Sequence, residues 1–252
     1  MNLADNIASS HYHGLQTSVN RRFAGGWQMQ FGYTYSKSID NASGTYGLDG
    51  GGTVFNPTNL NADRGLSNFN RKHNFRLSGV WAIPYKCKGV MNKMFANWQV
   101  TGVYTYLSGA PFTATSANNR VHNSTPTNSA NGRPDVIAGC DLYGGGDQTL
   151  QHWFNTGCYA LQPIGTYGNA GRSTLVGPKL WNLDTSLLKD IKFGETRSLQ
   201  FRAEGFNIMN HASFQAPNSQ IFTGTAINAN AGVISATNSQ PRQIQLALKF
   251  LF

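Results

Sequence analysis

Few residues of this chain have the types and spacing that catalysis or metal binding needs. His11 and His13 form an H-x-H pair, and on a strand both imidazoles would point to one face, where they could bind a metal ion. No third ligand accompanies them, so we expect a junction between a loop and a strand there instead. The chain has no G-x-S-x-G or H-E-x-x-H motif, and its few carboxylates form no tight pair suited to acid–base work. We therefore expect no enzyme, no metal site and no cofactor.

The composition narrows the class of protein further. Charged residues make up 12% of the 252 residues, which is about half the usual share. No apolar run approaches the roughly 18 residues of a membrane helix, so strands are the only route into a membrane. The net charge of +9 comes from scattered Lys and Arg, without a nucleic-acid-binding motif. We expect a basic lumen and basic loops that favour anionic solutes, and no nucleic-acid partner.

Seven segments alternate between apolar and polar residues with a period of two, as half-buried strands do. Each is about as long as the ten residues that a tilted strand needs to cross a bilayer. They lie at about Tyr12–Phe23, Trp27–Ser36, His73–Ile83, Trp98–Leu107, Trp181–Lys189, Ser198–Asn207 and Arg242–Phe252.

The connections between these segments alternate in length. Ala24–Gly26, Pro84–Asn97 and Asp190–Arg197 are the shorter ones, whereas 40–72, 108–180 and 208–241 are long. Outer-membrane barrels have short periplasmic turns and long external loops. The pattern therefore predicts an all-β fold, namely an antiparallel segment of a transmembrane β-barrel with long extracellular loops.

Six blocks carry a more specific signal: N-R-R-F-A-G-G-W-Q-M-Q-F-G-Y-T-Y-S-K-S-I-D (Asn20–Asp40), N-A-D-R-G-L-S-N-F-N-R-K-H-N-F (Asn61–Phe75), Y-G-N-A-G-R (Tyr167–Arg172), W-N-L-D-T-S-L-L-K (Trp181–Lys189), L-Q-F-R-A-E-G-F-N-I-M-N-H (Leu199–His211) and P-R-Q-I-Q-L-A-L-K-F-L-F (Pro241–Phe252). Together, and in this order, they resemble the TonB-dependent receptors with an Oar-like β-barrel. The resemblance implies a 22-stranded barrel, an N-terminal plug domain and energy supplied through TonB, in an outer membrane of the Gram-negative type.

The resemblance covers only the C-terminal part of such a receptor. Residues 1–10 lack the basic start and apolar centre of a signal peptide. We expect residues 1–252 to form about the last third of the barrel, roughly seven strands of 22, without the plug and the first strands. Seven strands with two unpaired edges cannot close. TonB and the plug would be reached only through the missing N-terminal part.

Charged residues on the predicted lumen face are the first candidate site. Arg202 and Glu204 share that face, Asp184 lies on the neighbouring strand, and Arg76 faces inward from the third strand. We expect an ion-pair network in the barrel wall at Asp184, Arg202 and Glu204, and the alternative is that they line the solute path or touch the plug.

Charged residues and cysteines in the connections are the second candidate. Asp63, Arg64 and Arg71 lie where a long connection re-enters the barrel, and we expect them to brace it, with contact to a ligand as the alternative. Cys140 and Cys158 share one predicted loop and could form a disulfide outside the cell. Cys87 would then stay alone in a turn on the opposite side.

Aromatic residues near the predicted strand ends favour a membrane girdle. They are Trp27, Tyr33, Tyr35, Trp81, Trp98, Tyr104, Tyr106 and Trp181. Loop aromatics offer an alternative, because they could stack on sugars: Tyr46, Tyr143, Trp153 and Tyr167.

The expected function is scaffolding in active uptake. Apolar strand faces meet outer-membrane lipid, polar faces line the lumen, and external loops gate or bind a substrate, for which a siderophore, an oligosaccharide, a peptide and an exported protein all remain open. The alternatives are a passive porin-like barrel built by several chains, a soluble β-sandwich that binds glycans, and a basic nucleic-acid binder.

The last strand yields a prediction about assembly. Its apolar face ends on an aromatic residue, and the resemblance suggests that the barrel-insertion machinery reads this pattern: Ile244, Leu246, Leu248, Phe250 and Phe252. Deleting Phe252 from the full-length protein should therefore reduce the amount that reaches the outer membrane. Unchanged insertion, measured by membrane fractionation, would count against the role of Phe252.

Overall fold

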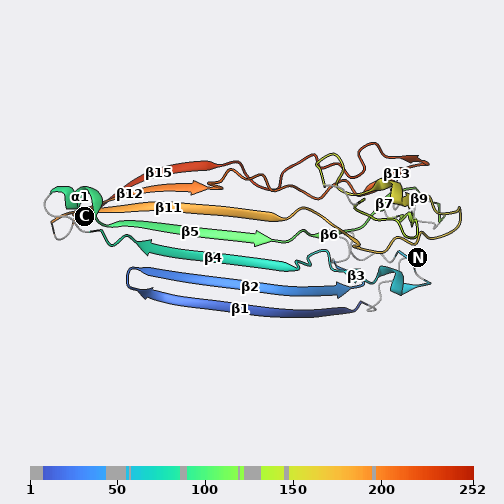
Figure 1. The fold of residues 1–252 in the computed structure, drawn as a ribbon, viewed down its shortest axis with the longest axis horizontal. Coiled ribbons are helices and arrows are strands. Elements are labelled where there is room, and N and C mark those ends of the chain that lie inside the picture. The colour runs from blue at the N-terminus through green and yellow to red at the C-terminus, as the bar shows by residue number, and fades with distance from the viewer. Residues whose placement is uncertain are drawn as a thin grey trace.

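The computed structural model describes residues 8–43, 55–56, 58–85, 90–118, 120–121, 132–144, 148–194 and 197–252, with only the backbone at Val90 and Lys93. Within these ranges the protein is all-β, and its main body is one antiparallel sheet (Figure 1). Seven long strands follow one another in sequence order across the sheet, in the places that the alternation predicts. They are β1 (Ser10–Ala24), β2 (Trp27–Asp40), β4 (His73–Ala82), β5 (Trp98–Leu107), β11 (Leu180–Phe193), β12 (Arg197–Phe206) and β15 (Gln243–Leu251).

The register of the ladders gives the sheet two unlike faces. One row across four strands joins apolar residues, namely Phe31, Leu77, Tyr104 and Leu183. The next row, on the opposite face, joins Gly32, Arg76, Thr105 and Asn182. Since side chains alternate along every strand, the pattern continues over the whole sheet. We call the two sides the apolar face and the polar face.

The shorter and longer connections lie at opposite ends of the sheet. In Figure 1 the shorter ones are at the left, whereas the long ones gather at the right. The tightest turn joins β1 to β2 through Gly25 and Gly26, whose φ angles are 63° and 84°. Two successive positive φ values are the geometry of a hairpin turn that matches strand twist, and glycine adopts them at little cost.

A short helix in the connection from β4 to β5 was not predicted from the sequence. It is α1 (Val90–Phe95), and a helix this short is marginal by itself. Contacts with the sheet hold its C-terminal end, because the Trp98 indole donates to the Met94 carbonyl at 3.1 Å and the Lys189 ammonium donates to the Ala96 carbonyl. No helix in the described ranges is long and apolar enough to span a membrane.

The long connections fold into a separate packed unit, which we call the loop cap (the described residues of 108–179 and 207–242, at the right of Figure 1). Its buried core consists of Ala114, Phe154, Cys158, Tyr159, Ala170, Leu175, Ile221 and Phe222. The seven long strands contribute none of these residues. Short elements build the cap and its surroundings: β3 (Gly65–Leu66), β6 (Pro111–Phe112), β7 (Thr115–Ala117), β8 (Asp135–Val136), β9 (Tyr159–Ala160), β10 (Leu175–Val176), β13 (Gln220–Thr223), β14 (Ala226–Ile227) and 3-10 turns at Leu60–Asp63 and Thr156–Cys158.

The outer strands β1 and β15 are the edges of the described sheet. They are not paired with each other in the ranges that the structure covers. Every residue of both strands is exposed, whereas the strands between them are mostly half-buried.

The two faces should respond to a new charge by different amounts. Phe31 lies midway along β2 on the apolar face and packs edge-on against Phe75, with ring centroids 5.2 Å apart. If this face contacts hydrocarbon, Phe31→Arg should lower the free energy of unfolding in lipid vesicles by about 2–4 kcal/mol. Gln30→Arg, one residue away on the polar face, is the matched control and should change it by less than about 1 kcal/mol. Equal effects in urea titrations would show that the faces do not differ in environment.

Candidate functional site

Aromatic residues form two groups on the apolar face, separated along the strands. At the end with the shorter connections, Trp27 is paired with Trp81. Toward the loop cap, one row joins Tyr33, Phe75, Tyr106 and Trp181 across four strands. Phe75 and Trp81 are six positions apart on β4, which corresponds to about 20 Å at the usual rise of a strand. A bilayer-facing apolar band flanked by aromatic residues has similar dimensions, about 25 Å.

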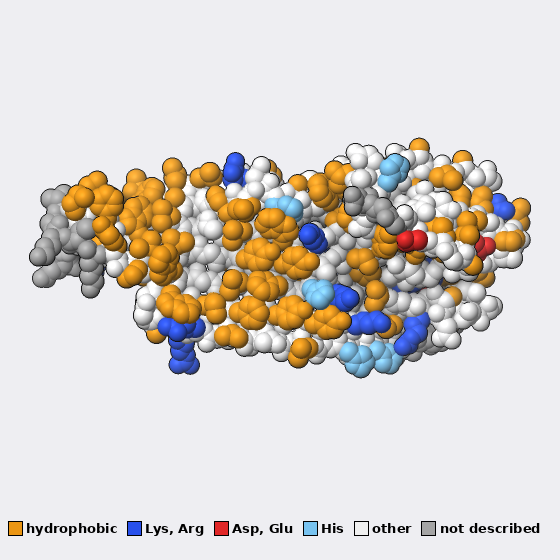
Figure 2. Space-filling model, viewed as in Figure 1, with side chains coloured by type: hydrophobic (Ala, Val, Ile, Leu, Met, Phe, Trp, Pro, Cys, Tyr) orange, Lys and Arg blue, Asp and Glu red, His pale blue; other side chains and the backbone are white. Residues whose placement is uncertain are grey.

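The remaining predicted girdle residues occupy related positions. Trp98 stands opposite Lys189 at the shorter-connection end, and Tyr35 stands opposite His73 near the loop cap. Tyr104 is paired with Leu77. It lies two residues along β5 from Tyr106, which belongs to the aromatic row near the loop cap. Figure 2 shows hydrophobic side chains gathered over the sheet, with Lys, Arg and His side chains along the margins of that area.

The polar face carries the predicted lumen residues. Arg202 and Glu204 form an ion pair at 3.4 Å, and the Arg202 side chain is 44% exposed. Arg76 is exposed on the same face, three strands away. An exposed pair of this kind contributes little to stability, so these charges are available to water and solutes at the sheet surface.

The predicted ion-pair network does not include Asp184. Its Oδ1 atom accepts hydrogen bonds from the Asn182 amide and from the backbone N–H of Asn207, both at 2.8 Å. Asn207 directly follows β12 and has a φ of 48°, so the chain turns out of the strand at the residue whose N–H Asp184 binds. The carboxylate therefore fixes the exit of the chain from β12, and its ion-pair role in the prediction is corrected.

Two ion pairs with little exposure join the end of β2 and the connection after it to the loop cap. Arg133 lies 2.5 Å from Asp63, and both side chains are less than 10% exposed. Arg133 also donates to the Ala62 carbonyl at 2.7 Å, and its guanidinium lies over the Phe55 ring at 4.3 Å. Burial lowers the pKa of Arg133, and the Asp63 carboxylate partly offsets that effect. Arg133 thus ties Phe55, Ala62 and Asp63 to the cap.

The second pair joins Arg172 to Asp40, the last residue of β2. Arg172 also donates to the Ser43 hydroxyl at 2.8 Å and to the Leu66 carbonyl at 3.2 Å. One side chain from the cap therefore binds the end of a long strand, the following connection and β3 together.

The other predicted bracing residues differ in their contacts. Asp63 contributes to the first ion pair, and it also accepts from the Phe55 backbone N–H at 2.7 Å. Arg71 donates to the Ser108 carbonyl at 3.4 Å, where β5 passes into the cap. Arg64 is exposed beside them.

The loop cap also contains a disulfide between Cys140 and Cys158, with the Cα atoms 5.5 Å apart. Cys87 lies outside the described residues. Burial raises the pKa of the nearby Tyr159 hydroxyl to about 12, which is typical of a water-poor interior.

The loop aromatics that could have stacked on sugars take part in packing. The Tyr143 hydroxyl accepts from the Val176 N–H at 2.7 Å, and the Trp153 indole donates to the Val176 carbonyl at 2.8 Å. Tyr167 packs edge-on against Phe55, with centroids 5.2 Å apart. Tyr46 lies outside the described residues.

His11 and His13 both lie on β1, where they face Ile39 and Lys37 of β2. A lysine opposite His13 is an unfavourable neighbour for a cation. No three His, Cys, Asp or Glu side chains are grouped as metal ligands in the ranges given above.

Sequence reasoning missed Arg133, Arg172, Asp40 and Asn207. Their role depends on partners about 20 to 130 residues away, as for Arg172 and Asp40 with a sequence separation of 132. For Asp40, Arg133 and Arg172 the sequence offered only a weak signal, namely isolated charges within segments otherwise rich in Gly, Asn, Ser and Thr.

The buried pair makes a test of the loop cap possible. Arg133→Met should destabilise the cap by about 3–5 kcal/mol, because the Asp63 carboxylate would remain buried without its partner. The double variant Asp63→Leu/Arg133→Met should recover much of that loss. Hydrogen exchange of cap amides measures both. Arg202→Gln, which breaks the exposed pair, is the control and should cost less than about 1 kcal/mol. A double variant no more stable than Arg133→Met would contradict the coupling.

A comparison with known protein families agrees with the fold described above. The family model for the outer membrane beta barrel domain matches residues 1–245, which include strands β1 to β14 and the loop cap. No curated protein and no solved structure matches the chain. The chain therefore belongs to the outer membrane beta barrel domain family and is an outer-membrane barrel protein.

Proposed function

We propose that this chain forms part of the barrel of a TonB-dependent receptor of the Oar-like type and that it serves active transport across the outer membrane. The apolar face contacts lipid, the polar face lines the lumen, and the loop cap recognises or gates the substrate at the outer end. The role is non-catalytic and requires no cofactor. TonB, the plug and the barrel-assembly machinery are its protein partners.

The loop cap is the observation that carries the proposal. A passive pore needs only an open polar lumen, whereas a receptor needs a surface of fixed shape. The cap has its own core, a disulfide and two ion pairs, one to the end of β2 and one to the connection after it. Recognition sites are commonly loops held on a rigid scaffold, and this arrangement supports that role.

The unpaired edges of the described sheet support the proposal that this chain is part of a larger barrel. Unpaired backbone groups within hydrocarbon cost several kcal/mol each, so membrane sheets close. The exposed edges at β1 and β15 would be paired in a barrel with additional strands. A barrel of 22 strands has room for the plug that active transport requires.

A porin-like assembly is the second candidate, because the same free edges would also pair between copies of this chain. A soluble glycan-binding sandwich has less support. A sandwich would bury the apolar face against a second sheet, yet Leu15, Trp81 and Leu246 are 64%, 51% and 67% exposed.

Conductance and TonB binding separate the two membrane candidates. The full-length protein, purified and inserted into planar bilayers, should show no steady channel current, because the plug blocks the lumen. It should also bind the periplasmic domain of TonB in a pull-down experiment. Deletion of the plug should open a large pore and serves as the control for insertion. Steady, discrete conductance of the intact protein without TonB binding would favour the porin.

A further inference from the structure

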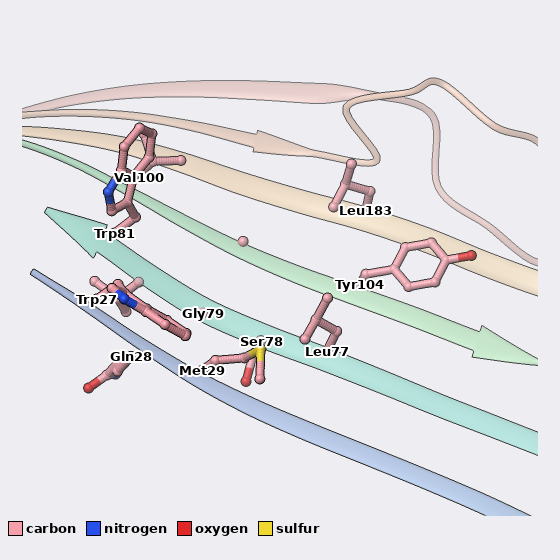
Figure 3. Close-up of a pocket in the computed structure, with 12 residues that line it drawn as sticks. Trp27, Gln28, Met29, Leu77, Ser78, Gly79, Trp81, Val100, Tyr104 and Leu183 are labelled. Atoms are coloured by element: carbon pink, nitrogen blue, oxygen red, sulfur yellow. The ribbon is translucent and has the colours of Figure 1, made fainter. Parts of the chain in front are cut away.

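A groove crosses the apolar face between β2 and β11 and has a volume of about 520 Å³. Figure 3 shows Trp27 and Trp81 at one end of it, and Leu77, Tyr104 and Leu183 toward the other. Its lining is almost entirely apolar, and Trp27 and Trp81 remain 37% and 51% exposed. The groove is therefore open to whatever medium surrounds the apolar face.

Two paired glycines leave the groove empty at its centre. Gly79 and Gly102 stand directly opposite each other on β4 and β5. The backbone does not require glycine at position 102, because its φ is not positive and an added Cβ would meet only the Asp184 carbonyl oxygen, at 3.9 Å. A glycine inside a strand weakens it and often marks a close approach by a ligand. The missing side chains at this row are what open the groove.

A cation lies at the end of the groove that is nearer the shorter connections. The Arg21 guanidinium lies over the Trp27 ring, with its Cζ atom 3.8 Å from the ring centroid. One of its N–H groups donates to the Ala24 carbonyl at 3.2 Å. A guanidinium has five such donors, so several remain for an anion. Phosphate suits this fork because it accepts two parallel hydrogen bonds.

The charged residues on the apolar face favour an anionic headgroup over a cationic one. The acidic residues of the seven long strands all lie on the polar face, at Asp40, Asp184, Asp190 and Glu204. The apolar face carries Arg21, Lys37, Lys189 and Arg197 instead. An anion at Arg21 therefore meets no carboxylate of these strands on its own face.

We propose that this groove binds one glycerophospholipid with a net negative headgroup, whose acyl chain lies over Gly79 and Gly102 between the two tryptophans and whose phosphate is held by Arg21. The lipid comes from the leaflet at the shorter-connection end. The acyl chain covers the apolar surface of the groove more closely than bulk membrane lipid does. The contact between the headgroup and Arg21 sets the preference for an anionic lipid. The site rests on the membrane placement of the apolar face and not on the transported substrate.

Brominated lipids test the proposal, because bromine on an acyl chain quenches nearby tryptophan. The protein is placed in vesicles of phosphatidylcholine that contain brominated phosphatidylglycerol or brominated phosphatidylcholine, and tryptophan fluorescence is measured at increasing lipid fraction. The anionic lipid should quench at fractions about two- to five-fold lower, the range expected of an exposed charge pair. Arg21→Gln should remove this preference. Arg76→Gln, on the polar face, is the control and should retain it.

Filling the groove gives an independent readout. Gly102→Leu should reduce quenching by both brominated lipids, whereas Ala203→Leu adds apolar volume elsewhere on the same face and should not. Gly102→Ala serves if the leucine variant fails to insert, which circular dichroism reports. Identical quenching curves for all variants would mean ordinary boundary lipid and would overturn the site. Weak quenching of the unmodified protein would mean that another protein segment covers the groove, which would also overturn it.

Discussion

Backbone hydrogen bonding between neighbouring strands is the constraint on which the rest of this structure depends. Hydrocarbon offers no partner for an N–H or C=O group, so each strand must be satisfied by its neighbours. The ladders from β1 to β15 do this in sequence order. Once the backbone is satisfied, the side chains need not form a core, and one face can stay apolar while the other stays polar. The same constraint means that the outermost strands also need pairing partners within a membrane.

The large buried apolar side chains are consequently found in the loop cap and not in the sheet. The cap projects beyond the apolar band, where water drives its side chains inward. Leu175 and Ile221 are fully buried there, whereas Leu246 and Leu248 of β15 are 67% and 69% exposed. Buried ion pairs such as Arg133–Asp63 add little net stability, because desolvation offsets their attraction. Their contribution is better understood as fixing one arrangement of long, glycine-rich segments that contain few apolar residues.

The predictable part of this structure is the part with local periodicity. Alternation specifies strands such as β2, and Gly25–Gly26 specifies its hairpin, because both signals lie within a few neighbouring residues. The loop cap has no such period. Arg172 meets Asp40 only after 132 residues of chain, and α1 depends on contacts from Trp98 and Lys189 rather than on its own sequence. The alternation correctly predicts that Asp184 lies on the polar face. Its partner is the backbone N–H of Asn207, where the chain turns after β12, and the alternation does not predict that contact.

Glycines show how one residue type serves unlike physical purposes in this fold. Gly25 and Gly26 supply positive φ angles, and a Cβ on Gly168 would overlap the Arg133 carbonyl beside the buried ion pair. Gly102 meets neither condition, since its backbone is extended and its surroundings are open. A lipid-facing surface packs against a fluid, so a side chain there would usually be tolerated and would favour the strand more than glycine does. The reason for glycine at this position therefore lies outside the chain, in the shape that the apolar face presents to its membrane.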